Sequence, residues 1–169
     1  MLYDLGVKIT RLRSPRDRKA AAALMAASDP WLALGLGLAH CLRTLAAPFR
    51  ETYMVKEGGA IAGLVTITMY GTFRGYIQSL FVAPAFRGKG IGEALMAYAE
   101  RSVFARSPNV FLCVSSFNKG AIRFYRRLGY RKAGLIKDFF EKGSDELLLR
   151  KTIGPLQSFN PGRNKHVKN

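Results

Sequence analysis

Cysteine is scarce in this sequence, and the two cysteines present, Cys41 and Cys113, lie far apart in the chain. They form no Cys-x-x-Cys pair, so neither a disulfide framework nor a zinc site is predicted. A long apolar run is also lacking, because no stretch reaches the roughly 18 uninterrupted apolar residues of a membrane-spanning helix. The N-terminus carries no secretory signal pattern. We therefore expect a cytoplasmic protein that binds no metal and contacts no membrane.

Acidic residues are also few. The chain has 27 Lys and Arg against 11 Asp and Glu, which gives a formal net charge of +16 at pH 7. A charge of this size predicts attraction to phosphates, acidic proteins or nucleic acid. Much of the excess lies near the two ends, and no helix-turn-helix, zinc-finger or aromatic RNA-binding pattern accompanies it. Contact with RNA or the ribosome stays open beside the alternative of a solvated surface.

Apolar residues are plentiful, at 49% of the 169 residues, and no repeat or long linker divides the chain. This composition favours one domain with a buried core. Strand-like and helix-like stretches follow the order β-α-α-β-β-β-α-β-α-β-β. We expect an α+β (α/β) fold in which a mixed sheet of about six to seven strands is flanked by about four helices. We expect residues 1–153 to form this domain and residues 154–169 to form a basic, mobile tail.

One expected helix begins near Trp31. Apolar residues recur at helical spacings from there until Pro48, which would end the helix. Gly35 and Gly37 lie inside this stretch and would make it soft or broken. Either a loop that shapes a pocket or close helix packing would explain them.

The most informative segment runs from Phe81 to Gly92. An apolar strand leads into Arg87-Gly88-Lys89-Gly90-Ile91-Gly92, and a helix follows. The glycines allow a tight turn and a close approach to a ligand, and the first amides of the helix have no partner within it. With the helix dipole and the basic side chains nearby, this loop is predicted to bind a phosphate or pyrophosphate. Its spacing fits neither a dinucleotide-binding fold nor a P-loop.

A second motif, from Asn118 to Tyr130, reads Asn-Lys-Gly-Ala-Ile-Arg-Phe-Tyr-Arg-Arg-Leu-Gly-Tyr. In order and separation the two motifs resemble the signatures of the GNAT superfamily of acyl-CoA-dependent N-acyltransferases. Those signatures are Arg/Gln-x-x-Gly-x-Gly/Ala after a strand and Asn-x-x-Ala-x-x-Phe/Leu-Tyr-x-x-x-Gly-Phe/Tyr. The resemblance extends from about Val7 to Thr152, and it implies the GNAT fold.

The resemblance also implies an activity: transfer of an acetyl group from acetyl-CoA to a primary amine, by direct attack in a ternary complex. The acceptor would be a protein or peptide N-terminus or a small-molecule amine. Tyr125 is the implied general acid, because a phenol can give its proton to the departing thiolate. The implied cofactor-binding residues are Leu80, Phe81 and Val82 for the pantetheine arm and acetyl group, Arg87, Gly88, Lys89, Gly90, Ile91 and Gly92 for the pyrophosphate, and Asn118 and Tyr125.

The general base is not fixed by the resemblance. In the branch that acetylates protein N-termini, which this chain partly resembles, a Glu commonly occupies the position of Cys113. A thiol in an apolar run has a raised pKa and is a poor substitute. Our first two candidates are Glu51 and Asp138. Further candidates are Glu141, His40, Tyr53 and Tyr70, and a relaying water or a partly neutral amine would need no base.

The acceptor and the oligomeric state are also open. Acidic residues gather toward the last hairpin, where they could attract a cationic amine, although solvation of a turn explains them too: Asp138, Glu141, Asp145 and Glu146. The missing glutamate leaves a rival function, a non-catalytic acyl-CoA-binding or RNA- or ribosome-associated regulatory module. A homodimer is compatible with the sequence.

Overall fold

The computed structural model describes residues 7–161, which form seven strands and four α-helices. The strands are β1 (Ile9–Arg11), β2 (Arg50–Glu57), β3 (Ala60–Thr68), β4 (Tyr76–Val82), β5 (Asn109–Ser115), β6 (Arg131–Ile136) and β7 (Glu146–Thr152). The helices are α1 (Pro15–Ala26), α2 (Leu38–Ala46), α3 (Ile91–Phe104) and α4 (Lys119–Arg127), and a short 3-10 helix, η1 (Pro84–Phe86), precedes the glycine loop.

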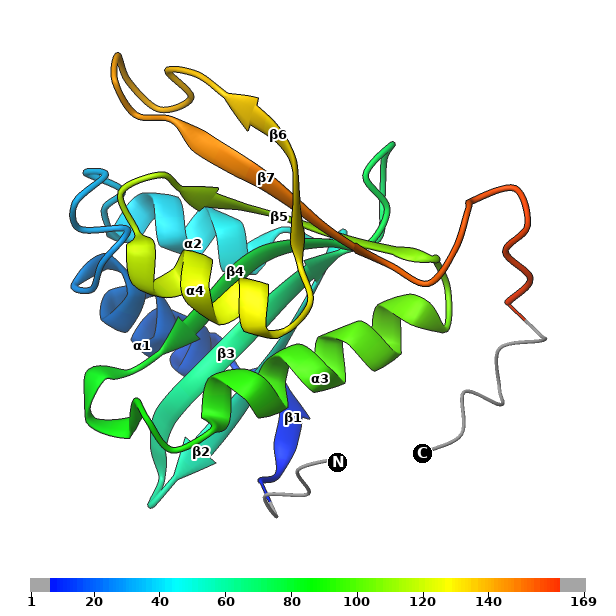
Figure 1. Ribbon diagram of the computed structural model, residues 1–169. Coiled ribbons are helices and arrows are strands. Elements are labelled where there is room, and N and C mark those ends of the chain that lie inside the picture. Colours follow the sequence, from blue (N-terminus) through cyan, green and yellow to red (C-terminus); the bar gives the residue numbers. More distant parts are fainter. Residues whose placement is uncertain (1–6, 162–169) are drawn as a thin grey trace.

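All seven strands belong to one sheet with the order β1-β2-β3-β4-β5-β7-β6. Neighbouring strands are antiparallel except β4 and β5, which are parallel because α3 crosses between them. Figure 1 shows the twisted sheet with the hairpin of β6 and β7 projecting at one end. The mixed α+β sheet predicted from the element order is confirmed.

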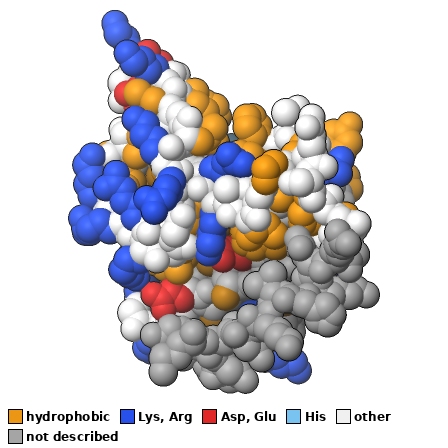
Figure 2. Space-filling model, turned by 45° about the vertical axis from the view of Figure 1, so that its right-hand side comes forward, with side chains coloured by type: hydrophobic (Ala, Val, Ile, Leu, Met, Phe, Trp, Pro, Cys, Tyr) orange, Lys and Arg blue, Asp and Glu red, His pale blue; other side chains and the backbone are white. Residues whose placement is uncertain are grey.

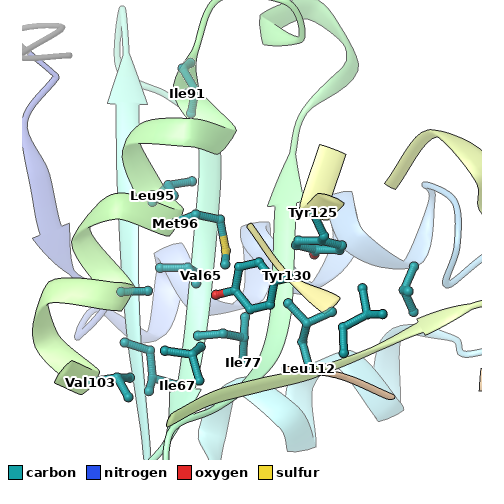
Figure 3. Packing of buried hydrophobic residues seen from close by; sticks show 14 of the residues in the cluster. Val65, Ile67, Ile77, Ile91, Leu95, Met96, Val103, Leu112, Tyr125 and Tyr130 are labelled. Carbon is teal, nitrogen blue, oxygen red and sulfur yellow. The ribbon is translucent and has the colours of Figure 1, made fainter. Parts of the chain in front are cut away.

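Helices cover both faces of the sheet. On one face α3 and α4 pack against β3, β4 and β5, and Figure 3 shows Leu95 and Met96 of α3 lying beside Val65. On the other face α1 and α2 bury Met25 and Leu45 against the sheet. Because both faces are covered, β3 is apolar and buried on both sides, as a central strand requires.

The second helix is shorter than the sequence predicted. It begins at Leu38 rather than near Trp31, and residues 29–35 form turns. Gly35 has a φ of 64°, a left-handed conformation that a helix cannot contain, and Gly37 is the N-cap of α2. The apolar residues in this stretch are not all helical: Trp31 is buried against the sheet from within a loop. This loop forms part of the site described below.

The C-terminal segment after β7 contains no helix or strand over residues 153–161. The remainder of the predicted basic tail, residues 162–169, and the first six residues lie outside the described part of the chain. Between residues 7 and 161, no helix is both long enough and apolar enough to cross a membrane.

Candidate active site

The sheet opens between its two parallel strands. Only Tyr76↔Phe111 and Ile77↔Leu112 are paired between β4 and β5. From Gln78 onward β4 keeps its partner β3 on one side and has no strand partner on the other. Backbone N–H and C=O groups on that side of β4 are therefore available to a ligand.

A cavity of about 920 Å³ extends from this opening. It is bounded by the end of β4, the glycine loop, the first turn of α3 and the inner side of α4. Of the residues that the sequence assigned to the cofactor, all but Lys89 line it: Leu80, Phe81, Val82, Arg87, Gly88, Gly90, Ile91, Gly92, Asn118 and Tyr125. The two motifs, separate in the sequence, thus meet around one cavity.

The glycine loop has the geometry of an anion site. Gly88 and Gly90 have φ values of 75° and 76°, a backbone conformation that residues other than glycine rarely adopt. Gly90 is also the N-cap of α3, and no side chain caps the first amides of that helix. Arg87 is anchored beside them by its Nε, which donates to the Val82 carbonyl at 3.2 Å. Lys89 lies with its Nζ 5.2 Å from the centre of the Phe86 ring.

Asn118 and Tyr125 are both positioned by α4, Asn118 at its start and Tyr125 within it. Asn118 is the N-cap of this helix, and its Oδ1 accepts from the Ala121 amide at 3.1 Å. Because the oxygen is used in the cap, the side-chain NH₂ can donate elsewhere. Tyr125 is buried on the inner face, where its ring meets those of Phe124 and Tyr130 edge to face. Burial raises the pKa of Tyr125, so the phenol holds its proton at neutral pH.

A second cavity, of about 400 Å³, meets the first at residues common to both walls, namely Pro30, Trp31, Leu80, Asn118, Ala121 and Tyr125. Its apolar walls come from the loop before α2 and from Phe139 and Phe140 in the loop between β6 and β7. Its polar side chains include His40, Tyr76, Cys113, Ser115 and Glu146. Tyr125 thus lies where the two cavities meet.

Glu146 was grouped with the solvated acids of the hairpin, but the structure buries it. It is the first residue of β7, only 4% of its surface is exposed, and it pairs with Ser115 of β5. Ser115 Oγ donates to its Oε1. Burial raises the pKa of this carboxyl, and the hydrogen bond from Ser115 only partly opposes that effect. The pairing of β5 with β7 joins residues far apart in sequence, so local patterns gave no signal for it.

The two carboxylates first considered as the base lie outside both cavities. Glu51 accepts two hydrogen bonds from Arg106, at 2.7 and 3.1 Å, and this guanidinium lowers its pKa. Asp138 is exposed, and its Oδ1 accepts from the Gly143 amide at 2.6 Å within the hairpin loop. The structure does not bring either group to the glycine loop or to Tyr125.

The remaining candidates are divided between the site and the surface. His40 lines the second cavity, and burial lowers its pKa, with smaller effects from Arg43 and Arg50. The Tyr53 hydroxyl donates a hydrogen bond to Glu51 Oε2, and burial raises the pKa of Tyr53 to about 12. Glu141 and Tyr70 are exposed and line neither cavity. Within residues 7–161 no cluster of three His, Cys, Asp or Glu side chains could hold a metal ion.

Comparison with known proteins gives relatives of similar sequence and similar fold. Residues 16–130 match the Acetyltransferase (GNAT) family. The N-alpha-acetyltransferase RimI of Mycobacterium tuberculosis is 29% identical over 150 residues, which are 86% of this chain and 90% of that protein. An aminoglycoside 6'-N-acetyltransferase complexed with coenzyme A has a TM-score of 0.73 at 17% identity, over 88% of this chain and 98% of its own. The ribosomal-protein-S18-alanine N-acetyltransferase from Escherichia coli has a TM-score of 0.71 at 17% identity, over 88% and 95%.

Proposed function

Because the chain belongs to the GNAT family of acetyltransferases, with acetyl-CoA as co-substrate, we propose that it acetylates a primary amine that enters through the second cavity. The observation that carries this proposal is the meeting of the two cavities at Tyr125 and Leu80. If the thioester lies along the open side of β4 in the first cavity, the acceptor amine would reach it through the second cavity. Direct attack in a ternary complex needs this arrangement.

Acetyl-CoA would bind largely through backbone groups. The glycine loop and the free amides of α3 suit its pyrophosphate, and the unpaired side of β4 suits its pantetheine amides. Phe81 would contribute only its backbone, because its ring packs on Trp31 with the ring centroids 6.1 Å apart. The Asn118 NH₂ group would donate to the arm. Tyr125 would then protonate the departing sulfur.

We propose the α-amino group of a protein or peptide as the acceptor, with a small-molecule amine as the alternative. The apolar walls around Leu34, Leu36, Phe139 and Phe140 would pack against the first side chain of a peptide. RimI of M. tuberculosis and the Arabidopsis thaliana protein MAK3 are both named N-alpha-acetyltransferases, which supports the same choice.

Free-thiol release from acetyl-CoA tests the proposal. We expect turnover with ten-residue peptides that have a free N-terminus, and none when the same N-termini are blocked. Kanamycin and 2-phenylethylamine represent the small-molecule alternative. Binding of acetyl-CoA can be followed by the fluorescence of Trp31, the single tryptophan of the chain, which lines both cavities. Saturable binding without transfer to any amine would instead support the non-catalytic acyl-CoA-binding module.

A polyanionic partner, such as RNA, is the second proposal. The exposed side of α4 carries Arg123 and Arg126, opposite the buried Ile122 and Tyr125, and Lys119 and Arg127 lie at its edge, where they also line the first cavity. Among these basic residues only Arg127 has an acidic partner within the described chain, Glu93 at 3.0 Å. Figure 2 shows Lys and Arg side chains gathered along one side of the molecule.

The cytoplasmic location and the homodimer stay predictions from the sequence.

The double variant Arg123→Ala, Arg126→Ala tests the RNA surface. Its binding to a single-stranded RNA should weaken. The slope of log affinity against log salt concentration should become less steep by about 1 to 2, because each lost phosphate contact reduces the size of the slope by about 0.7. The measurement is a titration from about 50 to about 200 mM salt. The matched control is Arg16→Ala, Lys19→Ala on α1, both exposed. Equal weakening by both pairs would mean that only net charge matters.

A further inference from the structure

The two cavities differ in electrostatic character. The walls of the first contain three basic and two acidic side chains. The described walls of the second contain no Lys or Arg, although the whole chain has a net charge of +16. Glu146 is the one acidic side chain among them. A cavity that lacks cations and offers a carboxylate favours a positively charged ligand.

The carboxylate of Glu146 is fixed but only half satisfied. Ser115 Oγ donates to Oε1, whereas Oε2 has no hydrogen-bond partner among residues 7–161. A buried carboxylate without a cation is unfavourable, and an arriving ammonium group would relieve that cost.

The other titratable groups around Glu146 supply no positive charge. Tyr76 faces it from β4 and Cys113 from β5, and burial raises the pKa of both groups. His40 on α2 has a lowered pKa, so it is largely neutral at pH 7. Tyr125 on α4 holds its proton. Asp145, the preceding residue, turns into the hairpin loop, where its Oδ1 accepts from the Asp138 amide at 3.1 Å.

We propose that Glu146, oriented by Ser115, binds the ammonium group of the acceptor and accepts its first proton. The inference rests on the amine acetylation proposed above. Once neutral, the nitrogen forms the new C–N bond and the C–S bond breaks. Tyr125 gives its proton to the sulfur and takes the second proton from the nitrogen, while Glu146 releases the first proton to solvent. The products are the amide, free CoA thiol and one proton.

Glu146→Gln is the test variant, because glutamine keeps the shape and can still accept from Ser115. At pH 7 we expect kcat/KM for a free N-terminal peptide to fall about 10²- to 10⁴-fold, the usual contribution of a general base. The deficit should shrink about tenfold per pH unit as the pH rises toward the pKa of the amine, because neutral amine then needs no base. The affinity for acetyl-CoA, measured by Trp31 fluorescence, should not change.

Three further variants complete the experiment. Glu57→Gln, at the exposed last residue of β2, is the control and should keep full activity. Glu51→Gln and Asp138→Asn test the two carboxylates predicted from the sequence. A deficit of Glu146→Gln that is constant with pH, or a comparable loss in either rival with Glu146→Gln active, would overturn the inference.

A thermal-shift measurement separates this inference from the proposed function. If the wild-type protein acetylates no amine, the proposed function fails. Glu146 is then judged by binding alone, with 2-phenylethylammonium as the probe. The probe should raise the melting temperature of the wild type but not that of Glu146→Gln. Equal shifts in the two proteins would overturn the role of Glu146, and the melting curves also show whether the variant is folded.

Discussion

Replacing Tyr125 with Phe is expected to lower kcat about 10²- to 10⁴-fold and to leave acetyl-CoA binding nearly unchanged. The phenol is buried at the meeting point of the two cavities and makes no hydrogen bond to the described residues, so Phe fills the same space without leaving a partner unpaired. The raised pKa keeps the phenol protonated over the working pH range. What the variant loses is the proton for the leaving thiolate. Free-thiol release with both acetyl-CoA and the peptide at saturating concentration gives kcat.

Tyr130→Phe is the matched control. Tyr130 is equally buried, with its ring centroid 5.7 Å from that of Tyr125, and it lines neither cavity. Its variant should turn over at the wild-type rate. Full turnover and an unchanged pH profile in Tyr125→Phe would remove Tyr125 from the mechanism.

Gly75→Ala is expected to destabilise the fold by about 2 to 5 kcal/mol. Gly75 has a φ of 92°, which costs an alanine about 1 to 2 kcal/mol. An added Cβ would also lie 2.4 Å from the Asn109 carbonyl oxygen and 2.5 Å from Val103 Cγ1. That crowding adds about 1 to 3 kcal/mol. Urea unfolding at equilibrium measures the loss.

Gly71→Ala separates the two costs. Gly71 lies in the same loop with a similar φ of 86°, but an added Cβ would meet nothing within 4 Å. This variant should lose only the backbone part, about 1 to 2 kcal/mol. Equal losses in the two variants would show that crowding against Asn109 and Val103 is relieved by a small shift.

Local patterns predicted most of the fold and the residues that line the first cavity, which is the proposed cofactor half of the site. The glycine loop is one continuous segment, and Asn118 caps the same helix that carries Tyr125, so their spacing in the sequence carries over into the structure. The periodic spacing of apolar residues also predicted most of the helices and strands along the chain. The helix expected from Trp31 was wrong because the periodic spacing of apolar residues cannot show a left-handed glycine at Gly35.

The second cavity, the proposed acceptor half of the site, was not predictable in the same way. Ser115 and Glu146 meet because β7 inserts between β5 and β6, a strand order that the sequence does not reveal. Burial then distinguishes Glu146 from Asp138 and Glu141, which share the same acidic stretch but are exposed. Strand order and burial both arise from tertiary packing, which sequence spacing does not report.

The incomplete pairing of β4 ties the stability of the sheet to its ligand. An acetyl-CoA arm bound along the free side of β4, as proposed above, would act as an additional strand, and its amides would complete hydrogen bonds that β5 leaves unmade. A ligand that binds only the folded chain stabilises it in proportion to the logarithm of its concentration. The resistance of this protein to unfolding and proteolysis would therefore rise and fall with the supply of acetyl-CoA in its surroundings.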